Sequence, residues 1–276
     1  KAVHIGIVGG GQLGKMLTMS AKKLGMYVTV IDPTPKSPAG QVADHQIVAD
    51  FKDEKAILEL AQMVDVITFE VELANDKALS QAMKQGKTVH PNPKTLRIIR
   101  DKLKQKQFLN KHKIPTSQFI EVNSQEDIIK AGKKFGYPFL LKARTDAYDG
   151  RGNALVRTPK DIQKGMDKLK DRALYVEKYV PFVKELAVVV ARSSKGEIAV
   201  YPVVETNHKD NICDTVISPA PISEKAWKNA QRLAKKTMKQ LAGAGVFGIE
   251  MFLTNRDQVL INEIAPRVHN SGHLTI

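Results

Sequence analysis

Cysteine, aromatic residues and long apolar runs are all scarce in this chain of 276 residues. Cys213 is its one cysteine, so no disulfide bond forms within the chain, and a small secreted fold held together by disulfides is excluded. No apolar run approaches the roughly 20 residues that cross a bilayer, so we expect no membrane partner. The aromatic content of 6% argues against a basic surface with interleaved aromatics. These shortages favour a cytoplasmic protein.

The N-terminus also lacks a targeting segment. Residues 1–8 read as a strand and do not have the basic start, apolar middle and small-residue cleavage site of a signal peptide. An initiator methionine is absent, so we expect the start to be trimmed.

Acidic residues are too few to balance the basic ones. Lysine and arginine number 43 against 29 aspartates and glutamates, a net charge of +14. Three interpretations are open: a nucleic-acid-binding surface, a solvated lysine-rich surface, or a field that steers small anionic substrates. The lysines are spread over expected helices such as 160–170 and 225–239 and form no compact arm. We therefore expect no nucleic-acid partner.

Residues 1–92 read as an alternation of strands and helices. Apolar, β-branched runs predict strands at 3–8, 27–31 and 64–69, with helices at 12–24 and 54–61 between them. This order predicts parallel strands with helices packed outside. Prolines at 91 and 93 place the first domain boundary there.

Residues 93–276 have a different, mixed pattern. A basic helix is expected over 94–111 and another over 224–241. Strands are expected at 139–143, 154–156, 174–179 and 186–191, followed by two more near the end of the chain. The hairpins in this order predict an α+β domain rather than a second doubly wound sheet.

A glycine-rich turn follows the first strand. Gly9, Gly11 and Gly14 fit G-x-G-x-x-G, and Asp32 ends the next strand, as in dinucleotide-binding folds. The same turn serves any tight strand-to-helix crossing. An NAD(P)-dependent oxidoreductase is therefore one alternative function.

Two glutamates near the C-terminus are predicted to face each other. If a hairpin turns between Arg256 and Asp257, Leu253 faces Leu260 and Glu250 faces Glu263. Like charges so placed need compensation, and Mg²⁺ held by one or two carboxylates and nucleotide phosphates supplies it. The alternatives are two solvent-facing glutamates and a carboxyl pair that shares a proton.

A lysine and a glycine-bearing loop suggest phosphate binding. Lys142 ends an apolar strand, where it needs an anionic partner or an exit to solvent. The loop 147–152 sets Arg151 between two glycines, which predicts a flexible flap over phosphates or an ordinary hairpin loop. Glu177 and Glu185 border the next strand ends and could contact a base and a ribose.

Together these residues resemble the ATP-grasp superfamily. The segment 262–273, NEIAPRVHNSGH, is similar to the signature of N5-carboxyaminoimidazole ribonucleotide synthetases. Segments 147–153 and 204–213 most resemble the synthetase part of fungal phosphoribosylaminoimidazole carboxylases. The likeness runs over 5–276. Val268 and Leu274 stand where the family usually has proline and tyrosine.

The resemblance implies an architecture and a reaction. It implies a Rossmann-like pre-ATP-grasp domain (1–92) and an ATP-grasp domain (93–276) with a mobile lid at about 115–180, a fold of α/β plus α+β type. Family members continue into a C-terminal subdomain that is apparently absent here, because the sequence stops at Ile276. The implied reaction joins bicarbonate to 5-aminoimidazole ribonucleotide through carboxyphosphate, with ATP and Mg²⁺, or Mn²⁺ instead. The implied partners are a second copy in a homodimer and a fused or separate carboxylase.

The resemblance and the chemistry of the side chains also assign roles. Catalysis goes to Arg267, His269, Tyr148, Asp149 and Arg151. Nucleotide binding goes to Arg100, Lys142, Gly150, Gly152, Glu177, Val180, Glu185 and His208. Ribonucleotide binding goes to Gln12, Glu72, Asn270 and Ser271, and the metal to Glu250 and Glu263. A structural role is the open alternative for His269 and His208.

Overall fold

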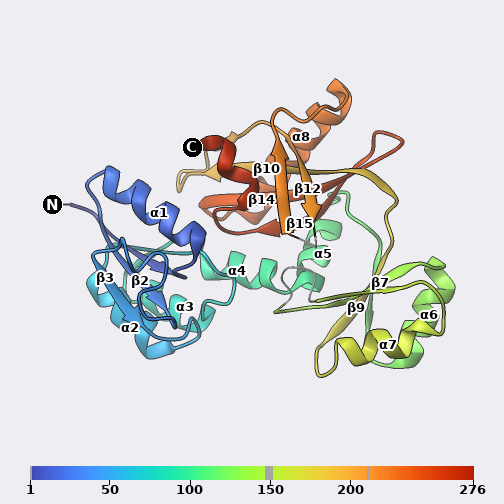
Figure 1. Ribbon diagram of the computed structural model, residues 1–276, viewed down its shortest axis with the longest axis horizontal. Coiled ribbons are helices and arrows are strands. Elements are labelled where there is room, and N and C mark those ends of the chain that lie inside the picture. The colour runs from blue at the N-terminus through green and yellow to red at the C-terminus, as the bar shows by residue number, and fades with distance from the viewer. Residues whose placement is uncertain (1, 147–151, 210–211) are drawn as a thin grey trace.

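Three β-sheets organise the chain. The computed structural model describes residues 2–146, 152–209 and 212–276. Figure 1 shows an N-terminal unit, a unit with the longest strands and a third unit at the far end, connected by two helices that run through the middle. We call their sheets the N-terminal sheet, the body sheet and the lid sheet.

The N-terminal sheet has five parallel strands in the order β3-β2-β1-β4-β5. They are β1 (His4–Val8), β2 (Tyr27–Asp32), β3 (His45–Val48), β4 (Val66–Phe69) and β5 (Thr88–Val89). The connecting helices are α1 (Gln12–Lys23), α2 (Glu54–Met63) and α3 (Asp76–Lys84). Residues of α1 share one core cluster with the sheet, and those of α2 and α3 share another. The predicted doubly wound arrangement is confirmed.

The lid sheet has four antiparallel strands in the order β6-β9-β7-β8. They are β6 (Phe119–Val122), β7 (Phe139–Ala143), β8 (Asn153–Val156) and β9 (Leu174–Lys178). Helices α6 (Gln125–Phe135) and α7 (Asp161–Lys168) pack on Phe139, Leu141 and Val176. Since side chains alternate along a strand, Lys142 and Glu177 lie on the opposite face of this sheet.

The body sheet has six strands, five of them in the order β13-β12-β10-β14-β15, with β11 paired to β10. They are β10 (Phe182–Arg192), β11 (Ile198–Val200), β12 (Val204–Lys209), β13 (Ile212–Ile217), β14 (Gly245–Thr254) and β15 (Val259–Ala265). Helix α8 (Glu224–Leu241) buries a row of apolar residues against β10 and β14. A 3-10 helix, η1 (Asn270–Thr275), ends the chain. No helix within the described ranges is both long and apolar enough to span a bilayer.

The expected helix over 94–111 is wrong, because the chain forms two helices there. Helix α4 (Pro93–Arg100) ends at Asp101, whose backbone is extended (φ −86°, ψ 104°), and α5 (Lys102–Lys111) then begins. The Asp101 carboxylate accepts the N–H groups of Leu103 and Lys104, which are otherwise unpaired at a helix start. This cap turns the chain so that α5 lies between the body and lid sheets.

A tight crossing between β1 and α1 predicts the effect of Gly14→Ala. A Cβ atom on Gly14 would lie 2.7 Å from the carbonyl oxygen of Gly9, and backbone cannot move aside as a flexible side chain can. We expect a loss of about 1–3 kcal/mol in the free energy of unfolding. Urea denaturation measures it.

Gly165→Ala is the matched control, because Gly165 also lies in a helix, α7. The nearest atoms to its added Cβ are 3.5 Å away, an ordinary contact. We expect no loss, or a gain of up to about 1 kcal/mol from the higher helix propensity of alanine. Equal effects of both changes would contradict the packing argument at Gly14.

Candidate functional site

A cleft of about 580 Å³ lies where the three sheets meet. The predicted site residues that line it come from the N-terminal unit, from α4, from the lid sheet and from the body sheet. They are Gln12, Glu72, Arg100, Lys142, Gly152, Glu185, His208, Glu250, Glu263, Arg267, His269 and Asn270. Residues spread over the whole chain are thus brought to one cavity.

Other predicted site residues do not line this cleft. Glu177 is 1% exposed and Ser271 is fully buried, while Val180 lies in the connection between β9 and β10. Tyr148, Asp149, Gly150 and Arg151 lie outside the described residues. The closing role predicted for that loop therefore stays a prediction.

The hairpin of β14 and β15 pairs Glu250 with Glu263, as the sequence predicts. The turn is one residue tighter than expected, however, and Leu253 pairs with Val259 rather than with Leu260. A β-bulge between the Glu250 and Met251 pairs absorbs the difference, and Asn262 is the extra residue. As a result Asn262 and Glu263, neighbours in sequence, both line the cleft.

The protein itself supplies the charges that compensate these two carboxylates. Lys102 of α5 forms ion pairs with Glu263 and, at 3.3 Å, with Glu72. Burial alone lowers the pKa of Lys102, but the two carboxylates raise it above its ordinary value. The expectation that a metal ion is the means of compensation is therefore incomplete, because Lys102 takes part of that role.

Glu250 is held by His269 and Asn262. The His269 Nε2 atom lies 3.3 Å from the Glu250 carboxylate, and the Asn262 amide donates to the carboxylate at 3.4 Å. Burial raises the pKa of Glu250, but the bond to His269 and the nearby positive charges lower it to about 2. The backbone N–H of Ser271 lies 3.3 Å from His269 Nδ1, so the Nε2 side of the ring faces Glu250. This geometry favours a positioning role for His269.

Arg267 and Glu72 meet on the side of the cleft nearest the N-terminal sheet. Glu72 follows β4, at the carboxyl end of the parallel strands, where α/β ligands bind. The Arg267 Nε atom lies 3.6 Å from the Glu72 carboxylate, and its Nη1 donates to the Val268 carbonyl at 3.0 Å. With respect to the described residues, other N–H groups of this planar fork remain for an anionic ligand.

The glycine-rich turn is closed by carboxylates of the protein. The Gly11 N–H donates to Glu70 at 3.3 Å, and the Gly10 N–H donates to Asp32 at 2.9 Å. A Cβ atom on Gly9 would lie 2.7 Å from the Glu70 carboxylate. Burial raises the pKa of Glu70. A dinucleotide fold uses such N–H groups for the pyrophosphate, so their bonds to carboxylates here do not favour dinucleotide binding.

Glu185 and His208 form an ion pair at another part of the cleft. They come from adjacent antiparallel strands, β10 and β12. The hydrogen bond to Glu185 raises the pKa of His208. The two residues predicted to contact the nucleotide are thus in direct contact with each other.

Glu177 joins a buried cluster behind Lys142. Its carboxylate lies 3.3 Å from Lys106 of α5 and 3.3 Å from Lys142 of β7, and it accepts hydrogen bonds from Ser117 at 2.6 Å and Tyr175 at 3.2 Å. Burial by itself raises the pKa of Glu177, but the two lysines lower it to about 2. Its side chain is therefore committed to the protein interior, which does not favour the predicted contact with adenine.

The sequence analysis did not single out several charged residues of this region, among them Glu70, Lys102 and Lys106. Lys102 and Lys106 are four residues apart and share one helix face with Gln105, and all three are buried. That spacing was visible in the sequence. It carried no signal, because lysine and glutamine surround it on α5 and nothing marked which face is buried.

Family models and known relatives match the chain over nearly its whole length. The ATP-grasp domain model matches residues 107–276, and the ribonucleotide synthetase preATP-grasp domain model matches residues 2–100. An N5-carboxyaminoimidazole ribonucleotide synthase of Synechococcus elongatus is 37% identical over 273 residues, which cover 99% of this chain and 69% of that protein. The chain belongs to this ATP-grasp family.

Two further relatives place the chain within the family. A phosphoribosylaminoimidazole carboxylase of Candida albicans is 45% identical over 278 residues, 99% of this chain and 49% of that protein. The chain thus spans about half the length of the carboxylases it matches. A crystal structure of the Aspergillus clavatus synthase with ADP and 5-aminoimidazole ribonucleotide has a TM-score of 0.93 and 40% identity, over 100% of this chain and 72% of that one. The predicted ATP-grasp fold is confirmed.

The buried Glu177 predicts a pH-dependent stability. Because its pKa is about 2 when folded and 4.5 ordinarily, its contribution is complete above pH about 4.5 and is lost as the pH falls toward about 2. We expect Glu177→Gln to lower the free energy of unfolding at neutral pH. The difference in free energy of unfolding between wild type and variant should shrink between pH about 4.5 and about 2, by at most about 1.4 kcal/mol per pH unit.

Urea denaturation at several pH values measures this gap. Glu59→Gln, an exposed change on α2, serves as the control and should leave the unfolding curves unchanged. A constant gap between wild type and Glu177→Gln at every pH would refute the charged state of Glu177.

Proposed function

We propose that this chain carboxylates 5-aminoimidazole ribonucleotide, using bicarbonate and ATP. The observation that carries the proposal is the meeting of Lys142, Glu250, Glu263 and Arg267 at one cleft, in a chain of the synthase family. A phosphate-binding lysine, a carboxylate pair and a planar cation are the groups that phosphoryl transfer to a small anion requires.

The nucleotide is expected between the lid and body sheets. Lys142, at the end of β7, faces the cleft and is suited to the phosphates, and Glu185 and His208 are suited to the ribose hydroxyls. Arg100 also lines the cleft, but its guanidinium is 2.7 Å from Asp76, which leaves it a smaller role. The strand end near Val180 offers backbone groups for the base.

The carboxylate pair fits a nucleotide-bound magnesium ion. Among the described residues, no three acidic, histidine or cysteine side chains converge into a complete metal site. Glu250, Glu263 and Asn262 supply oxygens from one side, which suits Mg²⁺ or Mn²⁺ bound mainly through phosphates. When bound, the ion neutralises the charge that develops on the transferred phosphoryl group.

The other residues would handle bicarbonate and the amine. Arg267 binds bicarbonate. A bicarbonate oxygen then attacks the γ-phosphorus of ATP, which gives carboxyphosphate and ADP. The amine of the ribonucleotide then bonds to the carboxyl carbon, phosphate leaves, and the amine loses a proton. His269 holds Glu250 in place, and accepting that proton stays a second role predicted for it. Gln12, Glu72 and Asn270 line the side of the cleft where the ribonucleotide is expected.

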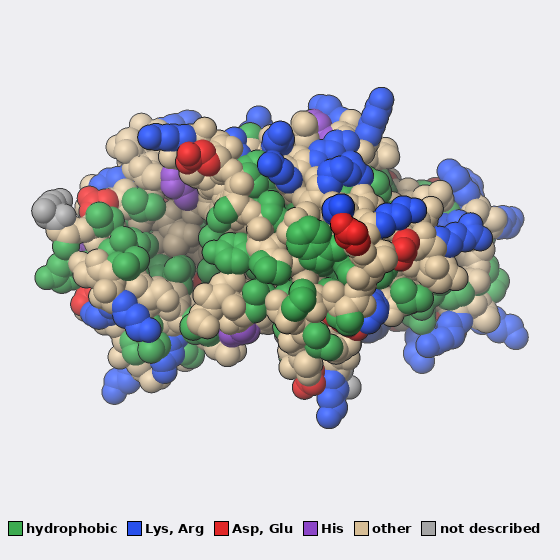
Figure 2. Space-filling model, turned by 90° about the horizontal axis from the view of Figure 1, so that it is seen from above, with side chains coloured by type: hydrophobic (Ala, Val, Ile, Leu, Met, Phe, Trp, Pro, Cys, Tyr) green, Lys and Arg blue, Asp and Glu red, His purple; other side chains and the backbone are tan. Residues whose placement is uncertain are grey.

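Rival functions have less support. Asp32 and Glu70 accept the N–H groups of Gly10 and Gly11, which would bind the pyrophosphate in a dinucleotide fold. This weighs against an oxidoreductase. Lys and Arg side chains are spread over several parts of the face in Figure 2 and form no single continuous stripe, which weighs against a nucleic-acid-binding module.

We also propose an assembly and a location for this chain. Fungal relatives are named carboxylases and are about twice as long, so we infer a fused or separate carboxylase as partner. A homodimer and a cytoplasmic location remain part of the proposal.

Phosphate release from ATP tests this function directly. We expect release to require bicarbonate and to rise further with 5-aminoimidazole ribonucleotide. Phosphate release at a rate independent of both compounds would contradict the proposal. So would stabilisation of the protein against heat by NAD but not by Mg·ATP.

Glu263→Gln tests the metal assignment. Loss of one carboxylate removes a ligand of the ion, so we expect bicarbonate-dependent phosphate release to fall by at least about a hundredfold. Glu59→Gln should release phosphate at the wild-type rate, since Glu59 is exposed on α2. Turnover of Glu263→Gln near wild type would show that the metal lies elsewhere.

Arg267→Lys tests the binding of bicarbonate. A lysine keeps the charge but loses the planar fork, so we expect a large rise in the KM for bicarbonate, about tenfold or more, with a lower kcat. Arg232→Lys on the exposed face of α8 is the control. An unchanged KM for bicarbonate would remove Arg267 from the proposed site.

A further inference from the structure

The buried cluster behind Lys142 carries an unbalanced charge. Lys106 and Lys142 share the one carboxylate of Glu177, on its two different oxygens. The side chains of Lys106 and Glu177 are 2% and 1% exposed, so solvent hardly reaches them. Two positive charges and one negative charge leave the cluster with a surplus of +1.

The two lysines use their hydrogen-bond donors differently. Lys106 directs its ammonium to Thr116 at 3.0 Å, Ser117 at 2.9 Å and Glu177 at 3.3 Å, which uses all three of its donors. Within the part of the chain that the structure describes, Glu177 is the ion-pair partner of Lys142, and Lys142 also borders the cleft. The surplus charge is therefore accessible at Lys142.

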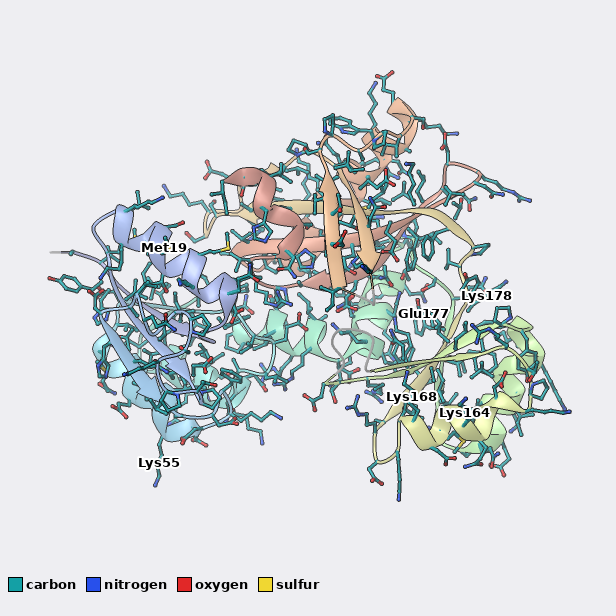
Figure 3. All side chains as sticks on the ribbon, in the orientation of Figure 1. Met19, Lys55, Lys164, Lys168, Glu177 and Lys178 are labelled. Atoms are coloured by element: carbon teal, nitrogen blue, oxygen red, sulfur yellow. The ribbon has the colours of Figure 1, made fainter. Side chains whose placement is uncertain are left out.

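The cluster also joins separate units of the fold. Lys106 lies on α5 and Ser117 in the segment that leads into the lid sheet, whereas Glu177 and Lys142 belong to that sheet. Figure 3 shows Glu177 where the lid meets α5, apart from Lys164 and Lys168 on α7. Lys106 therefore connects α5 to a residue of the lid sheet.

We propose that Lys106 is a positioning residue that keeps Lys142 available for the nucleotide phosphates. Lys106 binds one oxygen of Glu177, so the negative charge of this carboxylate is shared between Lys106 and Lys142. The positive charge that remains at Lys142 is then neutralised by a nucleotide phosphate. This inference rests on the nucleotide-binding role proposed above. Lys106 is not among the described residues that line the cleft.

Binding of Mg·ADP to a set of variants tests this proposal. In Lys106→Met the cluster becomes neutral, so we expect the Kd for Mg·ADP to rise about tenfold or more, because a nearby buried charge is weakly screened. In the double variant Lys106→Met, Glu177→Gln the surplus of +1 returns on Lys142. We expect its Kd to recover to within about threefold of wild type. Calorimetry measures both values.

A purely structural role for Lys106 predicts a different pattern. The double variant, which loses more native bonds, would then bind Mg·ADP no better than Lys106→Met. That result would overturn the proposal. If Lys106→Met does not fold, the double variant decides alone: binding within about threefold of wild type supports the proposal and loss of about tenfold overturns it.

Lys104→Met is the matched control, because Lys104 lies on the exposed face of the same helix. It removes the same charge without touching Glu177, and its Kd should stay at the wild-type value. If wild type does not bind Mg·ADP, the nucleotide proposal and this inference both fall. If wild type binds and Lys106→Met binds equally well, this inference alone falls.

Discussion

Buried lysines of α5 bind carboxylates from all three units of the fold. Lys102 binds Glu72, which follows a strand of the N-terminal sheet, and Glu263 of the body sheet. Lys106 binds Glu177 of the lid sheet. A buried charge is strongly unfavourable without a partner, so each of these contacts fixes a distance between α5 and another unit. This short helix thus contacts each of the three units that surround the cleft.

The position of α5 depends in turn on the break at Asp101. One carboxylate there caps the helix start and also binds Arg144, at 2.7 Å, beyond the end of β7. A continuous helix would point Lys102 and Lys106 along a different direction from the one their partners occupy. The cap therefore connects a local rule of helix termini to the geometry of the proposed nucleotide site.

Much of the fold follows from patterns visible in the sequence. The parallel order of the first domain came from alternating apolar runs, and the Glu250–Glu263 pairing came from the hairpin. What the sequence did not show is which lysines are buried. Lys102 and Lys106 look like Lys104 and Lys111 in composition, and their burial is decided by contacts with residues up to 161 positions away. Such long-range pairing has no local signature.

The bulge at Asn262 leaves its own trace in the chain. Val259, Ile261 and Ile264 all point into the body core, although 261 and 264 are an odd number of positions apart. In an unbroken strand, every second residue shares a face. The extra residue moves the side chains that follow it to the other face of the strand. Core residues spaced first two and then three positions apart are therefore a sign, in the sequence, of a bulge in the backbone.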